Sequence, residues 1–138
     1  MIMPILAVKD LDTSIAFYKD KLSFEHSFTM PGPDGKPSFA VVNLGQSVSI
    51  GLQLALMTEQ RGHGVVFMVY LPDTVDIDQF YADVHARGVQ VAVPIKTEYW
   101  GDRVFSIHDP DGYYLSMTKT VKQLSPEEIM AAGSQNAT

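Results

Sequence analysis

Three side chains that could transfer protons or bind a metal lie together near the end of the chain. His108, Asp109 and Asp111 occupy the turn in FSIHDPDGYYLSM, residues 105–117, between two alternating apolar segments. Asp-Pro-Asp-Gly is also a typical tight turn, in which Asp accepts backbone hydrogen bonds, Pro restricts φ and Gly takes the left-handed conformation. We therefore predict that the two aspartates form a turn that directs the following strand, and that they are not catalytic.

The other histidines show no spacing that is typical of a catalytic or metal site. His63 follows Glu59 by four residues, which would suit a shared metal on a helix, but glycines flank His63 on both sides. His85 falls near the end of a predicted helix, where an imidazole suits the helix dipole. His26 lies in a predicted strand and is open to a pocket or a surface position. The chain has no HExxH, GxSxG or P-loop motif.

The segment TEYWGDRVF, residues 97–105, is the most distinctive aromatic stretch. It contains the single tryptophan of the chain, Trp100, together with Tyr99 and Arg103. A loop that exposes these side chains would offer stacking and cation–π contacts to a flat or anionic ligand. The alternative is that Trp100 only closes one end of a sheet, and the sequence favours neither interpretation.

An internal repeat indicates which elements position these residues. Residues 8–22 resemble residues 71–85 at a constant offset of 63 residues, which pairs Asp10 with Asp73. Each copy has the pattern of a strand, a helix and three further strands. The predicted fold class is therefore α+β, built from two βαβββ modules.

The module boundaries are predicted at residues 1–57 and 64–118. Together the modules form a single domain, residues 1–118, and residues 119–138 form a C-terminal extension.

Local signals mark the ends of the predicted helices. Asp12 or Thr13 is expected to cap the first helix, and Asp76 the second. The segment GPDGKP is typical of a hairpin loop. Ser125 begins a capping box, Ser-Pro-Glu-Glu, that opens a short helix in the extension, and the final SQNAT is expected to fray.

The composition excludes several classes of protein. Hydrophobic residues make up 46% of the chain, charged residues make up 19%, and the formal net charge is −6, with the basic residues scattered. We therefore expect no nucleic-acid partner and no membrane association. The absence of cysteine excludes disulfides and thiolate metal sites. The N-terminal MIMPILAVKD is too short and too soon charged for a signal peptide, so we expect a soluble cytoplasmic protein.

The two βαβββ copies, the segment VKDLDTSIAFYKDKLSF and the terminal YWGDRVFSIHDPDGYYLSM together resemble the vicinal oxygen chelate superfamily. This superfamily contains glyoxalase I, the bleomycin-resistance proteins, fosfomycin-modifying enzymes and extradiol dioxygenases. The resemblance covers residues 4–118 and implies curved mixed sheets around a half-open cup, followed by a short C-terminal helix. It also implies a homodimer whose cups are completed or shielded across the interface. It does not select one chemistry, because this fold hosts many.

In the metal-dependent members, His and Glu ligands come from the first and last strands of each copy. The matching positions here are Met3, Val66, Ser116 and Gly51, or Gln53 in place of Gly51 if the hairpin is slipped by two residues. None of these side chains is a carboxylate or an imidazole, which divalent cations prefer. The resemblance therefore implies no metal at the usual place and no expected cofactor, unless His63, Glu98 or His26 supplies a displaced ligand.

The predicted pocket residues are those that strand alternation places on the same faces as these positions, together with the aromatic stretch. They are Met3, Ile5, Gly51, Gln53, Val66, Met68, Tyr70, Tyr99, Trp100, Arg103, Tyr114 and Ser116. An apolar cup with a few hydroxyls suits a hydrophobic or aromatic molecule. A well-filled barrel without a cavity is the structural alternative.

The resemblance implies metal-independent binding of a small hydrophobic or aromatic molecule, similar to the bleomycin-resistance proteins. The acidic net charge would modestly favour a cationic ligand. The alternative is a glyoxalase- or dioxygenase-type metalloenzyme (a lyase, isomerase or oxygenase) with displaced ligands and a divalent metal. A third class is a protein that holds no small ligand and acts through contacts with another chain.

Overall fold

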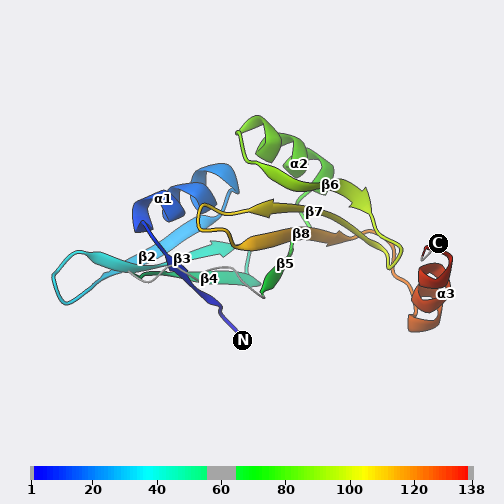
Figure 1. Ribbon diagram of the computed structural model, residues 1–138, viewed down its shortest axis with the longest axis horizontal. Helices are drawn as coiled ribbons and strands as arrows, with labels where there is room; N and C mark the ends of the chain where they lie inside the picture. Colours follow the sequence, from blue (N-terminus) through cyan, green and yellow to red (C-terminus); the bar gives the residue numbers. More distant parts are fainter. Residues whose placement is uncertain (1, 56–64, 137–138) are drawn as a thin grey trace.

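Each half of the chain folds into one four-stranded mixed sheet with a helix against it (Figure 1). The structure is a computed structural model, and it describes residues 2–55 and 65–136. The first half contains β1 (Ile5–Val8), α1 (Leu11–Ala16), a π-helical turn η1 (Phe17–Lys21), β2 (Glu25–Pro31), β3 (Pro37–Leu44) and β4 (Val48–Leu54). The second half contains β5 (Val66–Tyr70), α2 (Ile77–Ala86), β6 (Val91–Thr97), β7 (Asp102–His108) and β8 (Tyr114–Thr120), and α3 (Pro126–Asn136) follows it.

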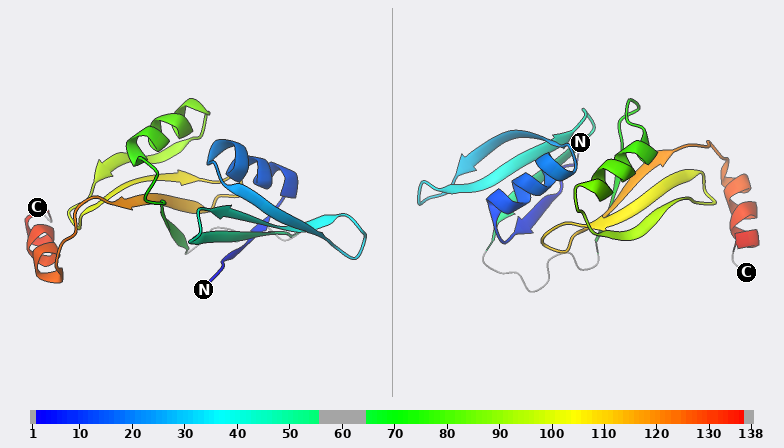
Figure 2. Two further views of the ribbon diagram at one scale, coloured as in Figure 1. Left: turned by 180° about the vertical axis from the view of Figure 1, so that it is seen from behind. Right: turned by 90° about the horizontal axis from the view of Figure 1, so that it is seen from above.

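The strand orders of the two sheets are the same. They are β1-β4-β3-β2 and β5-β8-β7-β6. The pairs β1–β4 and β5–β8 are parallel, and all other neighbouring strands are antiparallel. This topology confirms the predicted α+β fold of two βαβββ modules. Helices α1 and α2 lie next to each other on the same side of the sheets (Figure 2). No helix among the described residues is long and apolar enough to cross a membrane.

The core lies between the helices and the sheets, as strand alternation predicts. Leu6 and Val8 of β1 and Leu115 of β8 are buried, and they belong to one hydrophobic cluster that also includes Phe80 and Val84 of α2. The cluster runs through both halves of the chain, so the two sheets share one core.

The helix starts differ in part from the sequence prediction. Asp76 caps α2 as predicted, and its side chain accepts a hydrogen bond from the Gln79 backbone at 3.1 Å. The cap of α1 is Asp10, which accepts from the Thr13 backbone at 2.9 Å, so the expectation of Asp12 or Thr13 was wrong. The helix begins earlier because Asp10 already adopts the extended conformation that a cap needs.

The turn between β7 and β8 fastens the second module to the first. Asp109 Oδ1 accepts hydrogen bonds from the backbone of Asp111 and Tyr113, which confirms its turn-forming role. Asp109 Oδ2 accepts from the Tyr18 hydroxyl of η1 at 2.9 Å. The Tyr113 hydroxyl donates to the Ala7 carbonyl and accepts from the Ala7 N–H, both at 3.0 Å. The turn therefore holds β1 and η1 as well as the strand that follows it.

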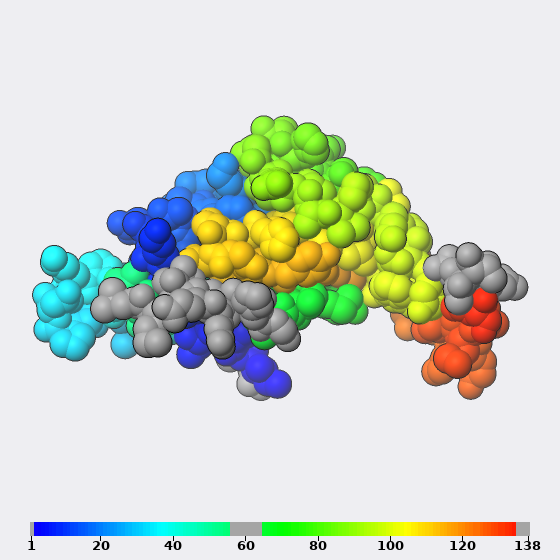
Figure 3. Space-filling model, in the orientation of Figure 1, coloured from blue at the N-terminus to red at the C-terminus, as the bar shows by residue number. Residues whose placement is uncertain are grey.

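Helix α3 projects from the end of the second sheet, beyond the rest of the molecule (Figure 3). The predicted capping box is present, because Ser125 Oγ accepts from the Glu128 N–H and Glu128 Oε1 accepts from the Ser125 N–H, both at 3.1 Å. The helix continues to Asn136, so the expectation that fraying begins at Ser134 was wrong, and residues 137–138 lie outside the described residues. The Ser134 hydroxyl donates to the Met130 carbonyl within the helix and so does not interrupt it.

Candidate functional site

The side of the two sheets opposite α1 and α2 carries no helix among the described residues (Figures 1 and 2). We call this side the cup face. Directly paired residues of neighbouring strands share one side of a sheet, so the register defines which residues belong to the cup face.

In the first sheet, two rows of paired residues cross the cup face. They are Ile5, Gly51, Val41 and Phe28 in one row, and Ala7, Gln53, Phe39 and Met30 in the next. In the second sheet, four rows follow the same rule. They are Val66, Tyr114 and His108; Met68, Ser116 and Ser106; Tyr70, Thr118 and Val104; and finally Thr120 with Asp102.

Large apolar side chains on the cup face are open to solvent. The exposed fractions are 60% for Val66, 58% for Ile5 and 51% for Met30, and Phe28 and Met68 are exposed to a similar degree. Isolated apolar residues are common on protein surfaces, whereas a contiguous array of them marks a binding or interaction surface. The cup face has that property in both sheets.

In the first sheet, the middle of the cup face is occupied by an aromatic ring. The Phe39 ring lies over Gly51, and a Cβ atom at Gly51 would come within 3.0 Å of the ring and 3.2 Å of Ile5 Cγ1. The glycine therefore provides the space in which Phe39 lies across the strands. Beside it, Asn43 accepts a hydrogen bond from the Ser49 hydroxyl and donates one to the Ser27 hydroxyl.

In the second sheet, the cup face contains a buried carboxylate. Asp102 is only 6% exposed, and its two oxygens accept three hydrogen bonds. Thr120 Oγ1 donates at 2.8 Å, Trp100 Nε1 at 3.1 Å and the Tyr70 hydroxyl at 3.3 Å. Burial raises the pKa of the Tyr70 hydroxyl, and the neighbouring Asp102 carboxylate raises it further. We call Tyr70, Trp100, Asp102 and Thr120 the carboxylate cluster.

Five of the predicted pocket residues of the second half lie on the cup face, namely Val66, Met68, Tyr70, Tyr114 and Ser116. Tyr99 and Trp100 lie in the turn before β7, and Arg103 lies on the other side of the sheet. Arg103 points to the helix-bearing side, where its guanidinium binds Asp78 of α2 at 2.7 Å. Alternation separates Arg103 from Asp102, its neighbour on β7, so Arg103 is not brought to Trp100 and Tyr99. The Tyr99 ring packs edge-on against Trp100, with 5.0 Å between their centroids.

In the first sheet, the register places Gly51 opposite Ile5 and Gln53 opposite Ala7. Met3 precedes β1 and is half-buried. The structure thus brings Ile5, Gly51 and Gln53 onto one face, and leaves Met3 outside the paired strands.

The four superfamily metal positions do not fit a divalent cation. Met3, Gly51 and Val66 have no donor suited to a hard cation. Ser116 Oγ is 3.0 Å from Ser106 Oγ, and the two hydroxyls share a hydrogen bond. In the described part of the chain, no three His, Cys, Asp or Glu residues are grouped so that they could hold a metal ion.

The three candidates for displaced ligands are also not brought together. His63 falls outside the described residues. The His26 ring bonds Thr29 Oγ1 at 2.6 Å on β2 of the first sheet. Glu98 follows β6 of the second sheet and pairs with Lys96 at 3.2 Å.

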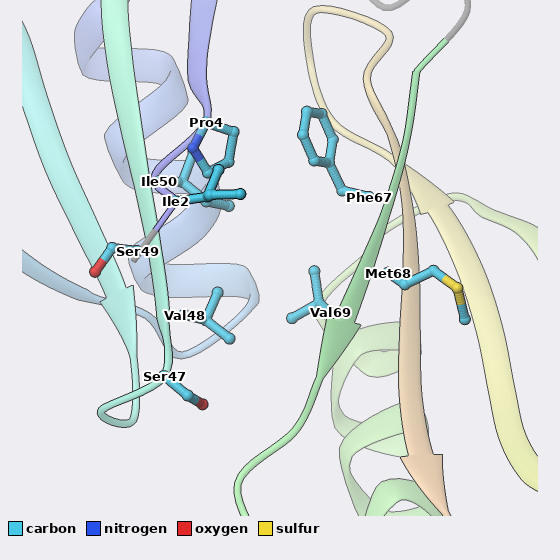
Figure 4. A pocket seen from close by; sticks show the side chains of 9 residues that line it. All are labelled: Ile2, Pro4, Ser47, Val48, Ser49, Ile50, Phe67, Met68 and Val69. Carbon is cyan, nitrogen blue, oxygen red and sulfur yellow. The ribbon is translucent and has the colours of Figure 1, made fainter.

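A groove of about 290 Å³ separates the two sheets (Figure 4). Phe67 and Val69 point from β5 toward Ile50 and Val48 of β4, whereas Met68 points to the other side. Met68 is the one residue of the cup-face rows that lines the groove, so the groove adjoins these rows only at β5. It offers mostly apolar contacts to a small molecule.

Among the cup-face residues, Asp102, Thr120, Phe39 and Asn43 are not predicted from the sequence. Alternation within residues 103–108 and 113–118 predicts two strands that stop one residue short of Asp102 and two residues short of Thr120, so only an extension of both strands reaches this pair. Phe39 and Asn43 lie on a middle strand that was not assigned to the pocket, although the same alternation applies to it.

Comparison with known proteins places this geometry in context. The family model of the Glyoxalase/Bleomycin resistance protein/Dioxygenase superfamily matches residues 2–117. The chain is 27% identical over 135 residues to the uncharacterized protein Mb0911c of Mycobacterium bovis, and the match covers 94% of this chain and 89% of that protein.

Two solved structures are similar in fold. TnmS3, an antibiotic binding protein from Streptomyces sp. CB03234, has a TM-score of 0.69 and 25% identity, with 86% of this chain and 93% of that chain covered. TioX from Micromonospora sp. ML1 has a TM-score of 0.69 and 17% identity, with 91% and 99% covered, and this likeness concerns the fold alone.

Proposed function

The chain belongs to the Glyoxalase/Bleomycin resistance protein/Dioxygenase superfamily, and from this membership we propose that it binds a small hydrophobic or aromatic molecule on the cup face. We propose further that binding needs no metal ion and that the working form is a homodimer. A cytoplasmic location stays a prediction from the sequence.

The observation that carries the proposal is the apolar cup face with few polar groups. Exposed side chains such as Ile5, Val66 and Met68 supply hydrophobic contacts, and Met68 can adapt to irregular shapes. The carboxylate cluster and the Asn43 network supply polar contacts at two separate places. Few polar groups in a largely apolar site are what orients a small organic ligand.

The chemistry of the superfamily metal positions supports binding without a metal. Catalysis by a bound cation would require ligands that hold it and lower the pKa of its water. Met3, Gly51, Val66 and Ser116 do not form such a ligand set. Sequestration of a ligand requires affinity only, and TnmS3, a structural neighbour at 25% identity, is an antibiotic binding protein.

The exposure of the cup face supports a homodimer. A single copy leaves the side chains of Ile5, Met30 and Val66 more than half exposed. A second copy that faces the first would cover them, and symmetric pairing of identical apolar surfaces is the commonest route to a dimer. The ligand would then lie between the faces of two chains.

The proposal predicts saturable binding of a neutral aromatic probe, 4-tert-butylphenol, in isothermal titration calorimetry. The Met68→Lys substitution places a charge on the cup face and is expected to weaken binding at least tenfold, because the ammonium would lose its hydration in an apolar site. Thr74→Lys adds the same charge to the exposed loop before α2 and is expected to leave binding unchanged. Absence of saturable binding to the wild-type protein, or equal loss in both variants, would overturn the proposal.

A further inference from the structure

The Asp102 carboxylate has no cationic partner among the described residues. Its hydrogen-bond donors are a hydroxyl of Thr120, an indole N–H of Trp100 and a phenol of Tyr70, all of them neutral. A buried charge is normally paired with an opposite charge, because hydrogen bonds from neutral groups compensate only part of the lost hydration. The negative charge of this cluster is therefore available to a further group.

The basic residues of the surrounding strands do not neutralise this charge. Arg103 of β7 binds Asp78 on the helix-bearing side. Lys119 of β8 points to the same side, where its ammonium donates to the backbone carbonyls of Asp73 and Val75. Lys96 of the edge strand β6 pairs with Glu98, so this pair carries no net charge. Alternation thus directs the β7 and β8 cations away from the cup face and the carboxylate toward it.

Two aromatic side chains adjoin the carboxylate. The Tyr70 side chain is 48% exposed, and Trp100 is half-buried at the end of the same sheet. A ring whose O–H or N–H donates to a carboxylate becomes richer in electrons, which strengthens its attraction for a cation. An organic cation held against these rings would also feel the field of the carboxylate behind them in a weakly hydrated site.

We propose that the carboxylate cluster is the subsite for a cationic nitrogen, so that the preferred ligand is an aromatic or hydrophobic molecule that carries an ammonium group. Tyr70 and Trp100 contact the ammonium, and Asp102 acts through them as a positioning residue and as the source of negative potential. This inference rests on the proposed function, since it assigns one end of the same site.

The test compares two probes of nearly equal shape, the cation 4-hydroxyphenyltrimethylammonium and the neutral 4-tert-butylphenol, by isothermal titration calorimetry. The wild-type protein is expected to bind the cation at least about tenfold more tightly. Asp102→Asn should reduce this preference to less than threefold while the neutral probe still binds. Asp78→Asn removes the same charge from the helix-bearing side, and it should keep the full preference.

Each other outcome has a distinct meaning. Equal binding of the two probes to the wild-type protein would overturn the inference and leave the proposed function intact, whereas no binding of either probe would overturn both. A preference that persists in Asp102→Asn would reduce Asp102 to a structural role. If Asp102→Asn does not fold, Tyr70→Leu at an exposed position serves instead. This substitution should weaken binding of the cationic probe more than binding of the neutral probe. Equal weakening of the two probes in Tyr70→Leu would contradict the inference.

Discussion

At the scale of single residues, the Asp109 side chain joins its own turn to the first module. Its carboxylate accepts two backbone N–H groups in its own turn and the Tyr18 hydroxyl from the first module. Asp109 is 5% exposed, and Tyr18 is fully buried. The residue that first suggests catalysis in the sequence thus connects two modules, and it lies on the side of the sheets that carries the helices.

Substitution of Asp109 should separate its hydrogen bonds from its charge. Asp109→Ala leaves the Tyr18 hydroxyl and two turn N–H groups without an acceptor, so we expect a loss of about 2–4 kcal/mol in the free energy of unfolding. Asp109→Asn keeps the oxygen that accepts the two N–H groups and should lose much less. Urea denaturation at neutral pH measures both values. Equal losses in the two variants would contradict this account.

The pH dependence of stability tests the charge of Asp109. Burial raises the pKa of this carboxyl above its ordinary value of 3.8, although the hydrogen bonds from Tyr113, Tyr18 and Asp111 act in the opposite direction. The folded state therefore holds the proton more tightly, and the stabilising contribution of Asp109 is full below pH 3.8 and falls as the pH rises through the raised pKa. The stability of Asp109→Asn relative to wild type should increase over that window. A difference that stays constant or decreases would be inconsistent with a raised pKa.

At the scale of elements, the segment that connects β8 to α3 passes close to Gly101 in the turn between β6 and β7. Gly101 has a φ of +101°, and its carbonyl accepts hydrogen bonds from the N–H groups of Val121 and Lys122, both at 3.0 Å. Farther along, Gly133 of α3 lies against the Tyr99 ring. These contacts join the β6–β7 turn, which carries Trp100, to the C-terminal helix.

Gly101→Ala should disrupt this junction. Its Cβ would lie 2.1 Å from the Lys122 carbonyl oxygen, and the backbone would have to move. Gly112→Ala is the matched control, because Gly112 also has a positive φ, of +88°, but has no atom within 4 Å of the added Cβ. The control should lose about 1–2 kcal/mol from backbone strain, and Gly101→Ala should lose more and expose α3 to limited proteolysis. Equal losses would show that the junction contributes nothing.

Strand alternation explains both the accuracy and the limits of prediction at this scale. The buried side chains of Leu6, Val8 and Leu115 and the exposed ones of Ile5 and Met68 follow from a period of two within known strands. The same rule could not be applied past the expected strand ends.

Local sequence alone therefore does not show that the side chains at the start of β7 point to two different sides of the sheet. Closeness in sequence predicts that Tyr99, Trp100 and Arg103 share a surface, whereas the strand begins at Asp102 and turns Arg103 to the opposite side. The carboxylate cluster joins three strands and a turn, and its existence depends on register, which local pattern does not reveal. Similarly, the polar residues after Gly133 resemble a tail in the sequence, whereas α3 continues to Asn136.

At the scale of the whole molecule, the arrangement is one-sided. Helices α1 and α2 and the shared core lie on one side of the sheets, and the cup face lies on the other (Figure 1). A chain that buries only one side of two sheets leaves the other side for a ligand or a second copy. We have proposed both, with the ligand between two copies.

The dimer can be tested apart from the ligand. Sedimentation velocity of the wild-type protein should give twice the mass of the chain at micromolar concentration. Val66→Lys places a charge at an apolar cup-face position that is 60% exposed in the single chain, and it should shift the protein to the monomer, because burial of the ammonium is costly. Thr74→Lys should remain dimeric. A wild-type monomer, or a Val66→Lys dimer of unchanged stability, would refute the homodimer.

The central claim is that the cup face binds its ligand without a metal ion. The most direct measurement is calorimetric titration of 4-tert-butylphenol into protein dialysed against a chelator, with plasma mass spectrometry to verify that metal has been removed. The titration is repeated after addition of Ni²⁺, Zn²⁺, Fe²⁺ or Mn²⁺. We predict saturable binding to the metal-free protein with an affinity that no added metal changes more than twofold. Binding that appears only with a stoichiometric metal would contradict the claim and identify the protein as a metal-dependent member of its superfamily.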